Sequence, residues 1–220
     1  MKHKYLILDF GNVLAMPSGL DWDITPKMME LIDMDKLDID LFKTQRQRFG
    51  KLLSEPMTTL EEEYDMFVRF YDLILSNCNY PNYTKELAEQ IAYNRTYTND
   101  KYKLCDGVIE ELERLKKKYT LICLTDNWPC GTKYMKDNKL YDYFDKVYLS
   151  CEYGCLKSEK VFFDYPIKDY KIKKGEALFI DDNEINLDCA REKGMDVLLM
   201  DRYKEDKKSK YKIINDLWGI

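Results

Sequence analysis

Three short apolar segments of this sequence each end in an aspartate or a threonine, and this pattern constrains the fold more than any other feature. The segments and their polar ends are Tyr5–Leu8 with Asp9, Leu121–Leu124 with Thr125, and Ala177–Ile180 with Asp181 and Asp182. Short apolar runs bounded by turn residues are typical of buried strands. Open α/β sheets bind ligands just beyond the C-terminal ends of their strands. We therefore expect one sheet with a polar site at its carboxyl edge.

From Asp106 onwards, segments with helical spacing alternate with strand-like segments. We expect helices over residues 108–115, 131–138, 159–165 and 185–193, and strands over 121–124, 147–150, 177–181 and 197–200. Single helices between successive strands imply parallel pairing with right-handed crossovers. The sequence therefore predicts an α/β fold with a doubly wound parallel sheet. The charged stretch 204–212 and the apolar residues after it predict a final helix.

Between the first strand and this alternating region the periodicity is helical throughout. Apolar residues recur at spacings of three and four around residues 28–32, 41–49, 64–75 and 87–93. Thr58-Thr59-Leu60-Glu61 is a capping-box signature at the start of the third of these helices. We predict a helical cap domain over 18–97, inserted into a core domain of 1–17 and 98–220. An insertion at this point must follow the carboxyl end of the first strand, so we expect it to be a lid.

Charge and hydropathy exclude several classes of protein. The 35 lysines and arginines against 40 aspartates and glutamates give a net charge of −5, which argues against a nucleic-acid partner. No apolar segment approaches the roughly 18 residues of a membrane span. The apolar run before Asp9 is too short for a signal peptide. We expect a cytoplasmic protein without a membrane partner, and no motif indicates its oligomeric state.

The cysteine and histidine content limits the chemistry further. The seven cysteines form no C-x-x-C pair, so we expect reduced thiols rather than a zinc site. The chain has one histidine, His3, which excludes a Ser-His-Asp triad and a multi-histidine metal centre. Catalysis must therefore rely on carboxylates, a hydroxyl group and a lysine.

These residues together resemble the haloacid dehalogenase-like (HAD) superfamily, and the resemblance extends over the whole chain. The four motifs are carried by Asp9, by Thr125, by Lys157 and by the pair Asp181-Asp182. The resemblance implies a Rossmann-like core with an inserted helical cap. The stretch Asp9-Phe10-Gly11-Asn12-Val13 is similar to the subgroup of bacterial sugar-1-phosphate phosphatases, which includes α-D-glucose-1-phosphate phosphatase.

The same resemblance implies a magnesium-dependent phosphatase that acts on a small phosphorylated metabolite such as a sugar phosphate. Asp9 would be the nucleophile and form an aspartyl-phosphate, which divides one difficult hydrolysis into two steps. Mg²⁺ prefers oxygen ligands. The resemblance assigns it to Asp9, the carbonyl of Gly11 and Asp182, with Asp181 and Asn186 in support.

The phosphate-binding residues are implied in the same way. The hydroxyl group of Thr125 and the amides of Asp126 and Asn127 would bind the phosphoryl oxygens, whereas the side chain of Asp126 would be structural. Lys157 would neutralise the phosphate and keep Asp9 ionised. Each residue also has a structural reading, because aspartate and threonine often cap helices or form turns.

Gly11 departs from the family pattern. Most phosphatases of this superfamily carry a second aspartate at this position as a general acid and base, a role worth roughly 10²–10⁴-fold in rate. The departure leaves open a weakly active or non-catalytic phospho-ligand-binding protein. A third class is a cofactor-free dehalogenase, which needs the nucleophile but no cation. The adjacent Asp181 and Asp182 argue against that class.

Overall fold

The computed structural model describes residues 2–54, 57–205 and 208–220. They divide into two compact units, and each is considered by itself. The α/β unit comprises residues 1–16, 104–127 and 132–220, and the helical unit comprises 17–103 and 128–131. The helical unit thus takes in Pro17, 98–103 and 128–131 in addition to the expected 18–97.

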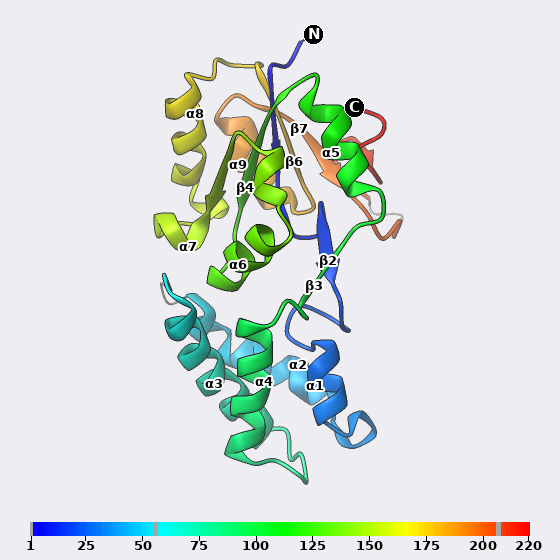
Figure 1. The fold of residues 1–220 in the computed structure, drawn as a ribbon, viewed down its shortest axis with the longest axis vertical. Coiled ribbons are helices and arrows are strands. Elements are labelled where there is room, and N and C mark those ends of the chain that lie inside the picture. The colour runs from blue at the N-terminus through cyan, green and yellow to red at the C-terminus, as the bar shows by residue number, and fades with distance from the viewer. Residues whose placement is uncertain (1, 55–56, 206–207) are drawn as a thin grey trace. The chain divides into compact units, whose positions relative to one another are not determined.

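The α/β unit is built on a six-stranded sheet, which lies in the upper half of Figure 1. Its strands, in spatial order, are β5 (Lys146–Leu149), β4 (Thr120–Thr125), β1 (Tyr5–Leu8), β6 (Ala177–Asp181), β7 (Asp196–Met200) and β8 (Ile213–Ile214). Every pairing between them is parallel. The central strand β1 is fully apolar and buried, as expected for a strand covered on both faces. The predicted α/β fold with a parallel sheet is therefore confirmed.

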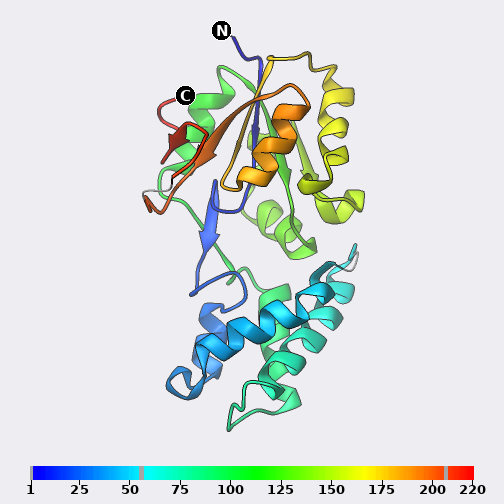
Figure 2. The ribbon, with the colours of Figure 1, turned by 180° about the vertical axis from the view of Figure 1, so that it is seen from behind.

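Helices cover both faces of this sheet. They are α5 (Val108–Lys116), α6 (Pro129–Asp137), α7 (Ser150–Tyr153), α8 (Asp164–Tyr170) and α9 (Glu184–Glu192), with 3₁₀ turns at Leu140–Tyr143, Lys157–Glu159 and Val161–Phe163. Helix α5 lies in front of the sheet in Figure 1, and α9 lies in front of it in Figure 2. Ile7, Phe179 and Leu187 belong to one buried cluster between the sheet and α9. This packing holds the C-terminal ends of the strands in fixed positions within the α/β unit.

The helical unit consists of α1 (Pro26–Leu31), α2 (Ile39–Phe49), α3 (Leu60–Ser76) and α4 (Lys85–Tyr97), with 3₁₀ turns at Met34–Lys36 and Gly50–Ser54. Thr59 caps α3 in a reciprocal capping box with Glu62, so the predicted capping signature is confirmed. Phe67, Phe70 and Ile74 lie on one face of α3 and are fully buried in a separate core. The helical unit therefore has a hydrophobic core of its own.

Two short strands were not predicted. The chain enters the helical unit through β2 (Ala15–Pro17) and leaves it through β3 (Tyr102–Leu104), and these two strands pair with each other. Three-residue strands carry too little periodicity to be recognised in a sequence.

Two predicted helices are wrong. The expected final helix is absent from the described part of the tail, where Ile213 and Ile214 instead form the parallel edge strand β8 beside Leu199 and Met200. The pair of β-branched residues favours this outcome. The expected helix over 159–165 is broken at Lys160, whose φ of 59° is left-handed, and α8 begins only at Asp164. Residues 206–207 of the predicted tail helix lie outside the described residues.

All seven cysteines are free, and six of them are buried. Among the described residues, no helix combines the length and the apolar character that crossing a membrane requires.

Candidate functional site

The predicted site residues of the α/β unit meet at the carboxyl edge of three adjacent strands. Leu8 of β1 is level with Cys123 of β4 and with Ile180 of β6. Asp9 follows Leu8 directly, and its backbone N–H donates to the carbonyl of Ile180 at 3.0 Å. The parallel register therefore brings the ends of all three strands to one place, as the sequence predicts.

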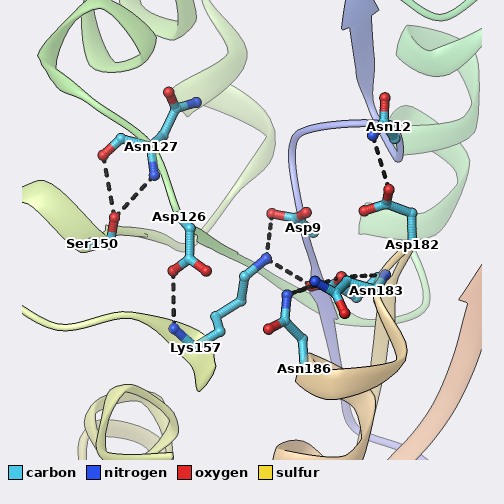
Figure 3. Close-up of polar contacts among 10 residues, drawn as sticks. Asp9, Asn12, Asp126, Asn127, Ser150, Lys157, Asp182, Asn183 and Asn186 are labelled. Atoms are coloured by element: carbon cyan, nitrogen blue, oxygen red, sulfur yellow. Dashed lines mark hydrogen bonds and ion pairs between the residues drawn. The ribbon is translucent and has the colours of Figure 1, made fainter. Parts of the chain in front are cut away.

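Lys157 connects two of these strand ends. It lies on the 3₁₀ turn Lys157–Glu159, and its side chain is almost fully buried. Its Nζ lies 2.7 Å from Oδ1 of Asp9 and 2.6 Å from Oδ2 of Asp181. Figure 3 shows the ammonium group between the two strand ends. A buried ammonium group needs such partners to offset the loss of its hydration.

Asp181 is fully buried and surrounded by donors. Besides Lys157, it accepts from the backbone N–H of Asn183 at 2.8 Å and from Nδ2 of Asn186 at 3.1 and 3.2 Å. Asn183 also caps α9 by accepting from the N–H of Ile185. The two asparagines therefore hold the carboxylate of Asp181 in place at the start of this helix.

Asp182 is only half-buried and is held differently. Its Oδ2 accepts from Nδ2 of Asn12 at 2.8 Å. Asn12 has a left-handed φ of 55°, a conformation that asparagine tolerates better than most residues. Gly11, before it, is not among the glycines with a left-handed φ, which are Gly107, Gly154, Gly175 and Gly194. Asn12 was not predicted as a site residue, and an asparagine after a glycine in the first turn was the one signal for it.

The three residues that end and follow β4 take different positions. Thr125 is the last residue of the strand and is buried. Asp126 accepts from the backbone N–H of Lys157 at 3.0 Å, so its side chain holds the turn that carries the lysine. The N–H of Asn127 donates to Oγ of Ser150 at 3.0 Å, and this hydroxyl donates back to the Asn127 carbonyl (Figure 3). The Asn127 amide is therefore already engaged.

The charges in this site do not balance without a further cation. Burial raises the pKa of Asp9 to about 8; Lys157 opposes this shift, and Asp181 and Asp182 add to it. Burial alone would lower the pKa of Lys157, but Asp181 and Asp9 outweigh it and raise this pKa. The single lysine is shared by two carboxylates. Asp9 therefore lacks a full counter-charge.

The residues fit a hard dication. One carboxylate oxygen each of Asp9, Asp181 and Asp182 lies within 4.8 Å of the others. Closely spaced carboxylates suit Mg²⁺, which takes oxygen ligands and one or two protein carboxylates. Since Asp181 is already saturated by three donor groups, Asp9 and Asp182 are the better placed direct ligands.

A sequence model of one family, described as haloacid dehalogenase-like hydrolase, matches residues 31–200. This range contains Thr125, Lys157 and the Asp181-Asp182 pair, and it begins after Asp9. A curated relative, the D-ribitol-5-phosphate phosphatase of Bacteroides thetaiotaomicron, is 26% identical over an alignment of 208 residues, which covers 88% of this chain and 89% of the relative.

Two solved structures show a similar fold. The putative HAD-hydrolase YfnB of Bacillus subtilis, bound to magnesium, superposes with a TM-score of 0.71 at 17% identity and covers 99% of this chain and 96% of its own. A variant of the HAD family enzyme bt-2542 of Bacteroides thetaiotaomicron, in complex with magnesium and inorganic phosphate, gives a TM-score of 0.62 at 23% identity. That alignment covers 93% of this chain and 97% of the other. At these identities the likeness shows a shared fold.

Proposed function

Since this chain belongs to the haloacid dehalogenase-like hydrolase family, we propose that it is a magnesium-dependent phosphatase with Asp9 as its nucleophile. The substrate would be a small phosphorylated metabolite, and a phosphorylated sugar or sugar alcohol is favoured by the similarity to a D-ribitol-5-phosphate phosphatase. The relative acts on a 5-phosphate, so the resemblance to the sugar-1-phosphate subgroup stays a prediction.

The observation that carries this proposal is the position of Asp9. It is buried at a strand end, its Oδ1 lies 2.7 Å from Nζ of Lys157, and two further carboxylates lie beside it. A phosphatase must supply a nucleophile and neutralise the phosphoryl oxygens. An ion-paired aspartate next to a place for a dication meets both requirements.

The reaction would proceed in two displacements. An oxygen of Asp9 attacks phosphorus, the bond from phosphorus to the ester oxygen breaks, and the alcohol leaves after taking a proton from water. Water then attacks the aspartyl-phosphate and releases inorganic phosphate and free Asp9. Lys157 would hold the nucleophile in place, and the hydroxyl of Thr125 would donate to a phosphoryl oxygen. Mg²⁺ held by Asp9, the Gly11 carbonyl and Asp182 would supply positive charge to the phosphoryl oxygens.

Gly11 supports a second candidate function. With no carboxylate side chain at this position, the leaving group lacks a general acid from the first motif, a deficit of roughly 10²–10⁴-fold in rate. The protein would then bind a phosphorylated ligand and turn it over weakly or not at all. A cofactor-free dehalogenase is disfavoured, because such an enzyme needs no cation, and the carboxylate of Asp182 would then have no metal ion to bind.

A turnover screen with Mg²⁺ separates these functions. The panel should contain p-nitrophenyl phosphate, sugar 1-phosphates, sugar-alcohol phosphates and a 2-haloacid, each with and without a chelator. We expect phosphate release that requires Mg²⁺ and no halide release. Tight binding of the phosphorylated compounds without turnover at any enzyme concentration would support the second candidate and contradict the first.

A further inference from the structure

The turn that follows β1 carries two groups of the candidate metal site. It runs over residues 10–15 and contains the carbonyl of Gly11 and the side chain of Asn12, which donates to Asp182. Within the turn, the N–H of Asn12 donates to the carbonyl of Ala15 at 2.7 Å, and the N–H of Ala15 donates to the carbonyl of Phe10 at 3.0 Å. Because the turn is closed by its own hydrogen bonds, a group that fixes one of its carbonyls also restricts the others.

Arg202 holds this turn from outside. It lies two residues after the end of β7, and its side chain is 7% exposed. Its Nε donates to the carbonyl of Val13 at 3.0 Å, and its Nη2 donates to Oε2 of Glu111 at 2.8 Å. One guanidinium group thus joins the turn after β1 to helix α5.

Glu111 gives the guanidinium group a fixed anchor. Its side chain is fully buried, and its Oε1 accepts from the backbone N–H of Leu217 at 2.8 Å. A buried carboxylate held by two donors cannot move without leaving one of them unpaired. A buried ion pair adds little stability compared with apolar side chains of similar volume, but the rigid fork of arginine fixes the direction of the groups that it contacts.

The segment that carries Arg202 is itself held by the edge of the sheet. The N–H of Asp201 donates to the carbonyl of Ile214 in β8 at 2.8 Å, and Nδ2 of Asn215 donates to the carbonyl of Asp201 at 2.7 Å. The hydroxyl of Tyr203 donates to Oδ1 of Asn12 at 3.4 Å, which is a second contact with the turn. All of these residues belong to the α/β unit, so their geometry does not depend on the helical unit.

The chemistry of the site makes the position of this turn important. Mg²⁺ demands nearly ideal octahedral geometry from its oxygen ligands. A side chain can adjust its direction by rotation about its own bonds, whereas the direction of the Gly11 carbonyl is set by the backbone of the turn. The residue that holds the turn therefore influences how well this carbonyl serves as a ligand.

We propose that Arg202 is a positioning residue for the candidate metal site, which holds the turn over 10–15 through the carbonyl of Val13 and so keeps the carbonyl of Gly11 in place as a ligand for Mg²⁺. This rests on the proposed phosphatase function, and it adds a residue outside the four motifs that maintains the geometry of the first one. Glu111 orients Arg202 for this role.

The test compares Arg202→Lys with Arg114→Lys as a matched control. Lysine keeps the charge beside Glu111, but its single nitrogen lacks the fork by which arginine serves Glu111 and Val13 together. Arg114 also donates from two nitrogens, but to two carbonyls within residues 217–220. In calorimetric titration of the metal-free proteins, we expect Mg²⁺ affinity to fall by about 10-fold in Arg202→Lys, the lower end of the range for a lost outer-shell partner. Arg114→Lys should bind Mg²⁺ as the wild type does.

Hydrogen exchange separates positioning from general stabilisation. In metal-free protein the amides of Asn12 and Ala15, which are bonded within the turn, should exchange faster in Arg202→Lys than in the wild type, whereas the amides of β1 should not change. With saturating Mg²⁺, the turnover of Arg202→Lys should return towards that of the wild type. A lower melting temperature with unchanged Mg²⁺ affinity and unchanged exchange in the turn would show that Arg202 is merely structural, and would overturn the proposal.

A second variant keeps the test decisive if Arg202→Lys does not fold. The double variant Arg202→Met with Glu111→Gln removes both charges, so it leaves no buried ion without a partner. The glutamine still has an oxygen that can accept from the N–H of Leu217. The same loss of Mg²⁺ affinity and the same faster exchange in the turn are expected, and wild-type values of both would overturn the proposal.

Failure of the phosphatase function would appear separately. If the wild type binds Mg²⁺ but hydrolyses no phosphate, the titration still decides the role of Arg202. If the wild type binds no Mg²⁺, the proposed function has lost its metal site, and the role of Arg202 as a support for a ligand fails with it. Faster exchange in the turn of Arg202→Lys would then show only that Arg202 holds the backbone there.

Discussion

Nζ of Lys157 lies 2.7 Å from Oδ1 of Asp9 and is shared with Asp181, whose Oδ2 lies 2.6 Å away. One cation thus serves two buried carboxylates, and a third, Asp182, lies beside them. A site with this excess of negative charge is prepared to bind a dication or to take up a proton. Its behaviour in solution should therefore depend on both Mg²⁺ and pH.

The first prediction concerns the metal. Asp182→Asn keeps the size of the side chain and an oxygen that can accept from Asn12, but it removes one charge from the site. We expect Mg²⁺ affinity to fall by about 100-fold or more, since one of two direct carboxylate ligands is lost. In metal-free buffer the variant should be at least as stable as the wild type, because repulsion among the clustered carboxylates of Asp9, Asp181 and Asp182 is reduced.

Calorimetric titration with Mg²⁺ and thermal unfolding in a chelator check these two expectations. Asp106→Asn, at an exposed position of the same unit, is the matched control and should behave as the wild type does. Unchanged Mg²⁺ affinity in Asp182→Asn would mean that the ligand set is wrong.

The second prediction concerns pH. Burial raises the pKa of Asp9 to about 8 in the metal-free protein, although Lys157 opposes the shift, whereas an unfolded aspartate titrates near 3.9. Between these values the native state holds a proton that the unfolded state releases, so native stability falls as pH rises from about 4 to about 8. Thermal unfolding in a chelator should show this fall relative to Asp9→Asn, which lacks the titrating group.

Saturating Mg²⁺ should abolish the difference between the two proteins in their pH dependence, because a bound dication favours the ionised carboxylate. Parallel stability curves for the wild type and Asp9→Asn in the chelator would show that Asp9 is ionised throughout. The charge argument for a dication would then be lost.

The third prediction concerns Gly11. The residue is not left-handed, so an aspartate can occupy its backbone conformation without strain of that kind. In the wild type, the rate should depend on the leaving group's own acidity, with aryl and anomeric phosphates preferred over alkyl phosphates. Gly11→Asp should help the poor leaving groups most, by up to about 10²-fold.

The slope of log kcat/KM against leaving-group pKa measures this effect in both proteins, with Gly11→Asn as the control that adds bulk without an acid. A flat slope in the wild type, together with no effect of Gly11→Asp, would show that another group supplies the proton.

The sequence predicts the α/β architecture and the meeting of the strand ends well, for a physical reason. Asp9, Thr125 and Asp181 each end a fully apolar run, and in a parallel sheet such ends must lie at one edge. Local sequence patterns gave wrong predictions where contacts with distant parts of the chain determine the secondary structure. Ile213 and Ile214 joined the sheet edge because Leu199 and Met200 offered a partner strand, and a helical periodicity of so few residues could not compete.

The burial of Lys101, whose side chain is about 2% exposed, could not be predicted from the sequence. Its environment is made by Trp22 and Trp128, which lie 79 positions before it and 27 positions after it, and no spacing rule connects them. Sequence patterns report neighbours within an element. A buried cation with aromatic contacts from three segments is visible only in the folded chain.

Trapping of the reaction intermediate tests the central claim most directly. Wild-type protein is mixed with Mg²⁺ and its best substrate, quenched in acid within the first turnover, reduced with borohydride and digested for mass spectrometry. We expect the modification that depends on phosphoryl transfer to map to Asp9 and to be absent from Asp9→Asn. The turnover of Asp9→Asn should fall by at least about 10⁴-fold, while its circular dichroism spectrum stays that of the folded wild type. Modification at another residue, or turnover by Asp9→Asn comparable to that of the wild type, would contradict the central claim.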